Sequence, residues 1–383
     1  MIGILTFYWA DDCGAMLQSY ALKTYLSQYQ ETVFIPYFPK PLRSRYRLLR
    51  YHELDNIFRR CYKITKQLMP WTFYKNCRLK YNMCRFRKMY LTEERRRLHS
   101  ARGIYDYTDQ IETYVVGSDQ VWNPEITAGF QDGYFCTFRS WKKDAARYVA
   151  YAASIGSERL DEKYTKTLSG LLQNFDAISL REALAVPYIQ QACEQELTVV
   201  LDPVFLIKRE EWLSLFDTKV QRKRKYIAVY YTEYNDEMAK YLRKMERETG
   251  WEVLMLRMGT FQWTEHTKYA IGCGPSEFLE LIYHAEYVVT NSFHGTAFSI
   301  LFQKPFTVFL HSRQGARIRD LLRVACLEDH LTDTADDITI DAKIDWERTE
   351  KALQKTIRHS KEFIEKEILF DGHGTGSVIL GKS

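Results

Sequence analysis

The sequence lacks the features that mark several classes of protein. It has only 9 prolines and 18 glycines in 383 residues, so it is neither collagen-like nor of low complexity. No stretch approaches the 18 or more consecutive apolar residues of a membrane-spanning helix, and no basic region opens the chain as it would open a signal peptide. We therefore predict a soluble globular protein of the cytoplasm.

Metal and nucleotide signatures are also missing. The eight cysteines are scattered without a C-x-x-C pair, and no histidines stand at zinc-finger spacing, so we expect reduced thiols, no disulfide and no metal. Walker A, G-x-G-x-x-G, G-x-S-x-G and H-E-x-x-H motifs are absent. These absences remove P-loop NTPases, Rossmann dehydrogenases, α/β hydrolases and zincins from the leading candidates.

Negative charge is scarce in one segment. Residues 40–102 contain 19 Lys and Arg against 4 Asp and Glu, a net charge of +15, whereas the whole chain carries only +5. Aromatic residues and helical spacing accompany the cations, which predicts a helical insertion. Three interpretations stay open: a solvated basic face, a surface for an anionic partner such as a phospholipid-linked or acidic glycan, and a nucleic-acid surface. No RNA-binding, zinc-finger or helix-turn-helix pattern supports the last, so we expect no nucleic-acid partner.

Apolar strands alternate with helical patterns along the chain. Such alternation predicts parallel sheets, and a charged break at 208–225 divides them into two α/β domains. The expected strands are 2–6, 114–116, 148–152, 177–179 and 198–201 in the first half, and 226–231, 251–256, 287–290 and 306–309 in the second. The expected helices include 15–29, 236–249, 276–284, 296–302 and 346–369.

The predicted fold is therefore α/β, with two Rossmann-like domains in tandem. The first domain spans 1–207 and contains the helical basic insertion at about 40–102. The second spans 208–345, and residues 346–383 form a C-terminal helix and tail.

The densest polar cluster follows the strand expected at 287–290. It contains Asn291, Ser292, His294, Gly295 and Thr296. As an anion site, Gly295 would let the backbone approach a ligand, the amides of a helix led by this glycine would point outward, and His294 would exchange a proton near neutral pH. The alternative is that Asn291 or Ser292 caps the helix and His294 is a bystander. A cap needs no histidine, so we favour the anion site.

A second candidate follows the strand expected at 177–179. Arg181 can hold a carboxylate or phosphate through two parallel hydrogen bonds, or it can form an ion pair with Glu182. Sequence alone leaves these alternatives open. Asp202, which precedes a proline, is interpreted as a turn or cap residue.

Two further turns carry polar residues and glycines. The loop of Gly117, Ser118 and Asp119 can meet a sugar hydroxyl or cap a helix. The turn at Gly14, with Gln18 one helical turn later, can line the same site or only pack. Because the carboxyl ends of parallel strands share one edge of a sheet, these segments are expected near each other.

Taken together, the strand-end segments resemble the polysaccharide pyruvyl transferase family. The resemblance spans nearly the whole chain, and its longest parts, VGSDQVWN and TNSFHGTAFS, are specific. The segments that carry it are GAMLQSYAL at 14–22, VGSDQVWN at 116–123, YAASIG at 151–156, AISLRE at 177–182, LDP at 201–203 and TNSFHGTAF at 290–298.

The resemblance implies a GT-B-like pair of domains with the active site in the cleft. It also implies transfer of a pyruvyl group from phosphoenolpyruvate to two hydroxyls of a sugar in a surface or exopolysaccharide, or in its lipid-linked precursor, to form a ketal. Arg181 would hold the anionic donor, and His294 would transfer a proton or bind the phosphate; Asp119, which we place among the catalytic residues, or Glu182 can share the acid-base work. The predicted substrate-binding residues are Gly14, Gln18, Gly117, Ser118, Glu182, Asn291, Ser292, Gly295 and Thr296.

The expected partners follow from this chemistry. They are phosphoenolpyruvate and a glycan or lipid-linked oligosaccharide acceptor, and the scheme needs no cofactor beyond the donor. Peripheral contact with the inner face of the membrane through 40–102 is a further expectation. Two alternatives remain: a GT-B-type glycosyltransferase with a nucleotide-sugar donor, and a non-catalytic glycan-binding protein.

Overall fold

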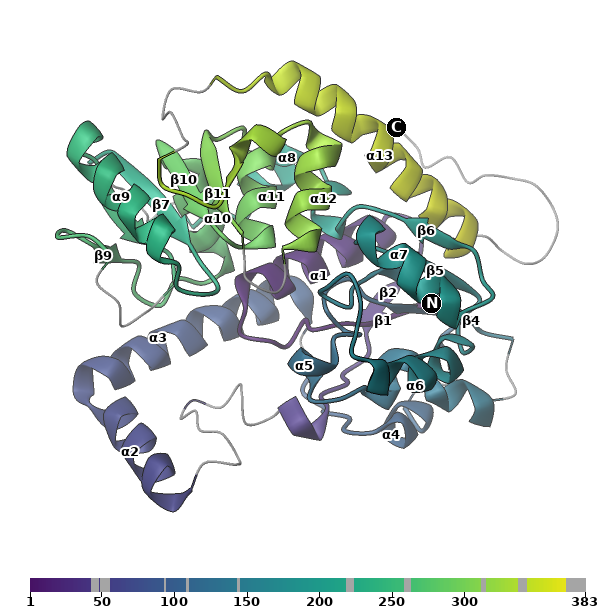
Figure 1. The fold of residues 1–383 in the computed structure, drawn as a ribbon. Helices are drawn as coiled ribbons and strands as arrows, with labels where there is room; N and C mark the ends of the chain where they lie inside the picture. The colour runs from purple at the N-terminus through teal and green to yellow at the C-terminus, as the bar shows by residue number, and fades with distance from the viewer. Residues whose placement is uncertain are drawn as a thin grey trace.

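The chain forms two parallel six-stranded sheets with helices packed around them (Figure 1). The computed structural model describes residues 1–42, 48, 56–92, 94–107, 110–142, 145–217, 224–257, 263–310, 315–336 and 343–369. The strand order is β2-β1-β3-β4-β5-β6 in the first sheet and β12-β11-β10-β7-β8-β9 in the second. This confirms the predicted α/β fold with two Rossmann-like halves.

The inner strands are short and buried apart from the first residues of β4 and β8, as parallel strands covered on both faces must be. The first sheet contains β1 (Ile2–Leu5), β2 (Thr32–Phe34), β3 (Thr113–Val116), β4 (Arg147–Ala153), β5 (Ala177–Leu180) and β6 (Leu197–Val199). The second contains β7 (Tyr226–Tyr230), β8 (Glu252–Met255), β9 (Lys268–Tyr269), β10 (Tyr287–Thr290), β11 (Phe306–Phe309) and β12 (Leu331–Thr332). Three of these, β2, β9 and β12, lie at sheet edges and were not predicted from the sequence.

Helices connect the strands, and none in the described part of the chain is long and apolar enough to cross a membrane. Those of the first half are α1 (Cys13–Leu26), α2 (Ile57–Leu68), α3 (Pro70–Phe86), α4 (Ala101–Tyr105), α5 (Pro124–Thr127), α6 (Glu162–Leu172) and α7 (Val186–Ile189). The remainder are α8 (Arg209–Leu213), α9 (Asp236–Thr249), α10 (Pro275–Tyr283), α11 (Phe293–Leu301), α12 (Ala316–Ala325) and α13 (Trp346–Glu367).

Each sheet has a point where the direction of strand order reverses. In the first sheet, β1 pairs with β2 on one side and β3 on the other, and in the second, β7 lies between β8 and β10. In open parallel sheets, ligands bind beyond the carboxyl ends of the strands at such a point. The loops after β1, β3 and β10 are therefore placed where a ligand site is expected.

Two elements tie the halves together. From α3, Asn82 Nδ2 donates to the carbonyl of Gly272 in the second half (2.7 Å), and Lys80 forms an ion pair with Asp11 in the first. At the other end of the chain, α13 runs from the second half across the first, where Ser360 Oγ accepts the amide of Leu201 at 2.9 Å (Figure 1). The domain boundaries at 207 and 345 stay predictions.

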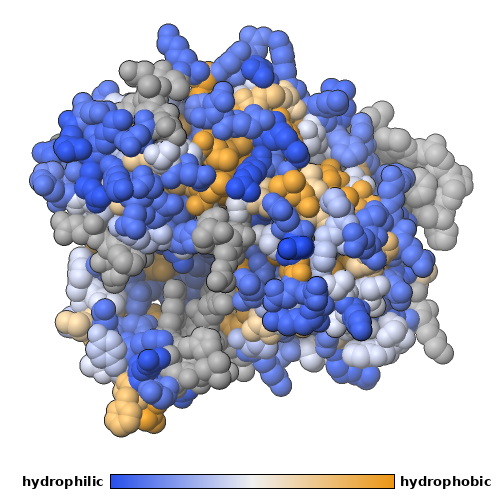
Figure 2. All heavy atoms as spheres, in the orientation of Figure 1, coloured by the Kyte–Doolittle hydropathy of each residue, from blue (hydrophilic) through white to orange (hydrophobic). Residues whose placement is uncertain are grey.

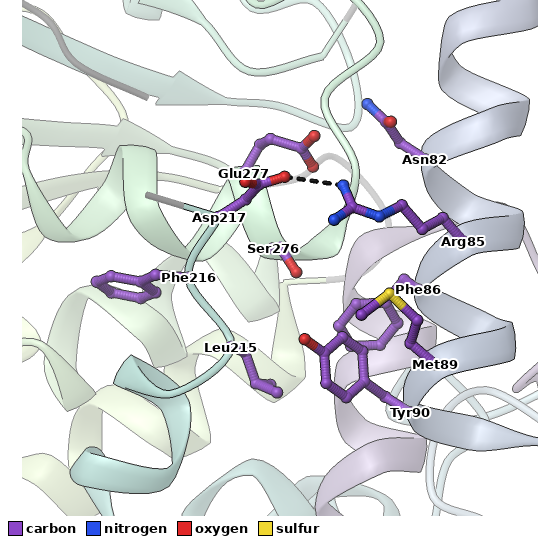
Figure 3. Close-up of a pocket in the computed structure, with 10 residues that line it drawn as sticks. All are labelled: Asn82, Arg85, Phe86, Met89, Tyr90, Leu215, Phe216, Asp217, Ser276 and Glu277. Atoms are coloured by element: carbon purple, nitrogen blue, oxygen red, sulfur yellow. Dashed lines mark hydrogen bonds and ion pairs between the residues drawn. The ribbon is translucent and has the colours of Figure 1, made fainter. Parts of the chain in front are cut away.

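A pocket lies between α3 and the second half of the chain (Figure 3). Arg85 crosses its edge and bonds Asp217 at 2.9 Å. The lining residues are Asn82, Arg85, Phe86, Met89, Tyr90, Leu215, Phe216, Asp217, Ser276 and Glu277. None of them is a residue predicted to bind substrate.

Candidate functional site

Arg181 is the centre of a buried polar cluster built from both halves of the chain. It follows β5 directly, and its side chain is 2% exposed. Nη1 donates to Asp202 Oδ2 at 2.5 Å, Nη2 lies 3.5 Å from Asp119 Oδ1, and the guanidinium carbon lies 4.6 Å from the ring centre of Phe293. Nε and Nη2 are buried without a hydrogen-bond acceptor among the described residues. Arg181 therefore presents the two-pronged edge that binds carboxylate or phosphate.

Asp202 holds Arg181 in place and also reaches the histidine. One oxygen accepts the amide of Val204 at 3.1 Å, which is the predicted cap. The other accepts from Arg181 and Ser118 (3.3 Å) and lies 3.7 Å from His294 Nε2. Burial alone raises the pKa of Asp202, but the interactions with His294 and Arg181 outweigh it and hold the pKa below its usual value. Asp202 is therefore a buried carboxylate ion at neutral pH.

A chain of hydrogen bonds from α1 and the loops after β1 and β3 supports Asp202. Gln18 is fully buried, and its amide donates to Thr6 Oγ1 at 3.0 Å; Thr6 in turn donates to the carbonyl of Ser118 at 3.0 Å. Ser118 Oγ lies within hydrogen-bond distance of both Asp202 and the carbonyl of Ala152 (3.1 Å). Gln18 and Ser118 thus position the carboxylate, and their predicted contact with substrate stays a prediction.

His294 lies where the two halves meet. Its side chain is 10% exposed and belongs to the first turn of α11. A Cβ atom on Gly14 would lie 2.0 Å from His294 Nδ1, so a glycine is needed at the start of α1 for the imidazole to fit. His294 is consequently fixed between Gly14 on one side and Asp202 on the other.

Helix α11 begins earlier than predicted. The sequence placed its start at Gly295 and Thr296, but the helix begins at Phe293 with Ser292 at the N-cap. Thr290 Oγ1 accepts the Ser292 amide at 3.0 Å and turns the chain directly after β10, and the Thr296 amide then bonds the Ser292 carbonyl at 3.0 Å. The outward-pointing amides are therefore those of the first turn, and the expected helix start at 296 is wrong, whereas a substrate contact of Thr296 stays a prediction.

Other residues of this loop make structural contacts. A Cβ atom on Gly295 would lie 2.3 Å from Thr290 Oγ1, so the glycine lets the helix pack on the strand. Asn291 Oδ1 accepts the amide of Thr232 at 2.7 Å, and its Nδ2 donates to the carbonyl of Glu233 at 2.9 Å. The side chain of Ser292 makes no capping hydrogen bond. Substrate contacts of these residues stay predictions.

Glu182 is buried beside Arg181 but does not pair with it directly. Its Oε1 accepts from Ser154 Oγ and from the amide of Gly156 at 3.3 Å, and lies 4.0 Å from Arg317 Nε. Burial raises the pKa of Glu182, and the positive charges of Arg181 and Arg317, which lower it, only partly offset this effect. The predicted alternative of an Arg181–Glu182 ion pair is replaced by the pair with Asp202.

Arg317 was not anticipated from the sequence. It lies in the first turn of α12, is 7% exposed, and its guanidinium carbon lies 5.7 Å from the ring of Phe293. Burial, together with the charge of Arg181, lowers the pKa of Arg317 to about 10, so it remains charged at neutral pH. Two buried guanidinium groups thus flank one aromatic ring.

Asp119 closes the cluster on its more exposed side. Its side chain is 13% exposed, against none for Asp202 and Glu182, and Oδ1 accepts the amide of Gln120 at 2.8 Å. The loop reaches this place because Gly117 has φ +112°, where a Cβ atom would lie 2.3 Å from the carbonyl oxygen of Tyr151. Of the predicted catalytic residues, Arg181, His294 and Asp119 are therefore brought together.

Sequence reasoning did not identify two residues of the cluster, Asp202 and Arg317, as site residues. Asp202 follows the end of β6 as Arg181 follows the end of β5, so it had the same positional signal as the arginine. Arg317 had none, because no helix was predicted around it. Both are needed to describe the charges around Arg181.

Several solved structures are similar to this chain at low sequence identity. UDP-GlcNAc 2-epimerase from Neisseria meningitidis aligns with a TM-score of 0.50 and 7% identity, covering 96% of this chain and 94% of that one. UDP-N-acetylglucosamine 2-epimerase from Rickettsia bellii aligns with a TM-score of 0.47 and 9% identity, over 96% and 98% of the two chains. ADP-heptose heptosyltransferase II from E. coli gives a TM-score of 0.36 and 10% identity, over 94% and 99%. The first of these supports a GT-B-like fold.

Sequence comparison supplies the family. No curated protein matches the chain significantly. A profile of the polysaccharide pyruvyl transferase family matches residues 12–313, which contain Gly14, Asp119, Arg181, Asp202 and His294. The match covers most of the chain and confirms the predicted resemblance: the chain belongs to the polysaccharide pyruvyl transferase family, and it is a pyruvyl transferase.

Proposed function

We propose that this pyruvyl transferase takes its pyruvyl group from phosphoenolpyruvate and transfers it to two hydroxyls of a sugar, giving a ketal. The acceptor is a surface polysaccharide or exopolysaccharide, or its lipid-linked precursor. The observation that carries the proposal is the edge of Arg181 formed by Nε and Nη2, which is buried and makes no hydrogen bond in the described structure, although the Asp119 carboxylate lies 3.5 Å from Nη2. Phosphoenolpyruvate has a carboxylate and a phosphate, and either offers the pair of oxygens that this edge binds.

A donor with two anionic groups needs a second group of donors. Arg317 supplies a second positive charge beside the ring of Phe293, which Arg181 also contacts. The amides in the first turn of α11 add hydrogen-bond donors. The lowered pKa of Arg317 means that its surroundings disfavour its charge, and a bound anion would relieve this cost. These features support a donor site at the junction of β5, α11 and α12.

The reaction moves protons without oxidation or reduction. Carbon 3 of phosphoenolpyruvate gains a proton, one sugar hydroxyl adds to carbon 2, and the second hydroxyl displaces phosphate as the bond from carbon 2 to the phosphate oxygen breaks. Of the two hydroxyl protons, one balances the proton on carbon 3 and the other leaves with phosphate. We therefore propose that no redox cofactor takes part.

His294 and Asp119 are the groups that we propose for these transfers. They are the more exposed titratable side chains of the cluster, at 10% and 13%, so they face the side from which an acceptor can approach. Asp202 orients the imidazole at 3.7 Å and balances its charge when both ring nitrogens carry protons. Arg181 and Arg317 bind the donor in this scheme and do not transfer protons.

Calorimetry with the full chain tests the donor before any acceptor is known. Phosphoenolpyruvate should bind, and Arg181→Lys should abolish most of this binding, because a lysine cannot form the two-pronged contact. Arg323→Lys is a matched control, since Arg323 lies on α12 with its side chain 57% exposed. Binding of UDP-N-acetylglucosamine with no binding of phosphoenolpyruvate would overturn the proposal in favour of a glycosyltransferase.

Turnover then tests the acceptor. The protein is incubated with phosphoenolpyruvate and a panel of oligosaccharides, and phosphate release is followed together with the mass of each acceptor. Phosphate release matched by pyruvylated acceptor supports the ketal transfer. Phosphate release with unchanged acceptor would show hydrolysis instead and would contradict it.

A further inference from the structure

Helices α2 and α3 meet at an open angle near Met69 and form an arm, here called the α2–α3 hairpin, that projects from the molecule (Figure 1). No residue of α2 is buried, and its side chain at Phe58 is 82% exposed. Figure 2 shows apolar side chains at the free end of α2, at the lower left of the molecule. The large apolar side chains exposed along the hairpin are Ile57, Phe58, Tyr62, Leu68, Met69, Trp71, Phe73, Tyr74 and Tyr81.

Only the base of this hairpin is packed. The second half of α3 buries Met83 and Phe86, and Asn82 and Lys80 fasten it to the two halves of the chain. Apart from Tyr81, the exposed apolar side chains precede this packed part. The free end of the hairpin, residues 57–74, therefore projects from the body, and the packed second half of α3 fixes its position.

The spacing in α2 separates apolar from charged side chains. Ile57, Cys61, Ile64 and Leu68 recur at intervals of three and four residues, which places them on one side of the helix. Cations occupy intervening positions, such as Lys66. A helix of this pattern, with no buried residue, is typical of segments that lie in the interface of a membrane.

The charge of the hairpin is of one sign. Residues 56–92 contain 10 Lys and Arg and no Asp or Glu. Trp71 stacks on Tyr74 with ring centres 5.7 Å apart, and Lys75 Nζ lies 5.0 Å from the Trp71 ring centre. Aromatic rings with an adjacent amine suit the boundary between lipid headgroups and acyl chains, where the ring is partly apolar and the amine meets phosphate.

We infer that the free end of the α2–α3 hairpin docks on the surface of an anionic lipid bilayer. A second copy of the hairpin would bring like charges together, and a nucleic acid would offer no apolar phase for Phe58 or Leu68. A bilayer that contains acidic lipids supplies both a negative surface and an apolar layer beneath it. This inference goes beyond the proposed function and does not depend on the donor.

Vesicle co-sedimentation with the full chain tests the inference. The protein should sediment with vesicles of phosphatidylcholine that contain phosphatidylglycerol. With vesicles of pure phosphatidylcholine it should stay in the supernatant. Arg59→Gln combined with Lys66→Gln should lower the partition coefficient by about 30-fold, since each cation near such a surface contributes roughly 1 kcal/mol. Phe58→Ser with Trp71→Ser should lower it by about 10-fold or more, because these rings lose their apolar contact.

Matched variants distinguish docking from general charge or hydrophobicity. Lys351→Gln with Lys355→Gln removes two cations from α13, and Trp141→Ser removes a tryptophan that is 46% exposed elsewhere; both should bind vesicles as the parent does. Melting temperatures show that each variant is folded.

Failure of the parent to bind acidic vesicles would overturn the inference, as would a hairpin-dependent change of oligomeric state or binding to nucleic acid in place of vesicles. Phosphoenolpyruvate binding by the same samples reports separately on the proposed function.

Discussion

Replacing Asp202 with asparagine tests the charge arrangement around Arg181. The substitution keeps the size of the side chain and the cap on Val204, but it removes the negative charge that faces Arg181 Nη1 at 2.5 Å and His294 Nε2 at 3.7 Å. Arg181 then stays buried, with its side chain 2% exposed, beside a neutral partner. Asp202→Asn should therefore destabilise the protein and also lower turnover, because His294 loses the group that orients it.

The size of the loss follows from burial. Removing one partner of a buried ion pair costs about 3 to 5 kcal/mol, because the remaining charge is uncompensated. Arg181 keeps Asp119 at 3.5 Å, which places the expected loss at the lower end, about 3 kcal/mol. Asp161→Asn is the matched control, since Asp161 is 70% exposed and its pair with Lys163 is screened by solvent.

Urea unfolding at several pH values measures this loss. The pKa of Asp202 is held below that of a free aspartate, so its stabilisation is fully present above about pH 4 and is lost as the pH falls through the lowered pKa. The stability difference between the parent and Asp202→Asn should therefore shrink in acid. Added phosphate should restore part of the variant's stability by supplying an anion to Arg181. A loss below about 1 kcal/mol, with no effect of phosphate, would refute the assignment of Asp202 as the buried counter-ion.

Three further substitutions test the site. His294→Asn should lower turnover by about 10²-fold or more while phosphoenolpyruvate binding survives, and near-normal turnover with an unchanged pH profile would remove His294 from the chemistry. Gly14→Ala places a methyl group 2.0 Å from His294 Nδ1 and should lower turnover in the same way by displacing the ring, which the ring-proton NMR signals of His294 would report. Arg317→Lys should raise the dissociation constant of phosphoenolpyruvate measured by calorimetry by about 10-fold or more, and an unchanged value would exclude Arg317 from the donor site.

The parts of the fold that sequence predicted well are those decided by local pattern. The strands β10 and β11 match their predicted bounds, because short apolar runs end at polar turns. The helix α9 matches as well, since Asn235 caps its start through the Met238 amide and Gly250 ends it with φ +69°. The edge strands β9 and β12, of two residues each, were missed because pairing with one neighbour alone creates them.

The candidate site was predicted in part for the same reason. Arg181, Asp119 and His294 follow strands, and parallel strands bring their carboxyl ends to one edge, so proximity could be inferred from sequence. The partner of Arg181 could not, because Glu182 is adjacent in sequence but is held by Ser154 and Gly156, and Asp202 comes from the next strand in the sheet. The start of α11 depends on a side-chain contact of Thr290, which no helical pattern reveals.

The position of the second half relative to the first determines the chemistry of the site. Arg181 and Asp202 belong to the first sheet, whereas His294 and Arg317 reach the cluster from α11 and α12. Gly14 belongs to the first half and His294 to the second, and they are so close that no Cβ atom fits between Gly14 and the imidazole. A small rotation of one half would therefore disturb this contact and move His294 relative to Asp202. The connections made by α3 and α13 oppose such a rotation from two sides. The base of the α2–α3 hairpin thus helps to hold together the two halves that form the site. Its free end has the exposed charge and apolar surface of a docking element.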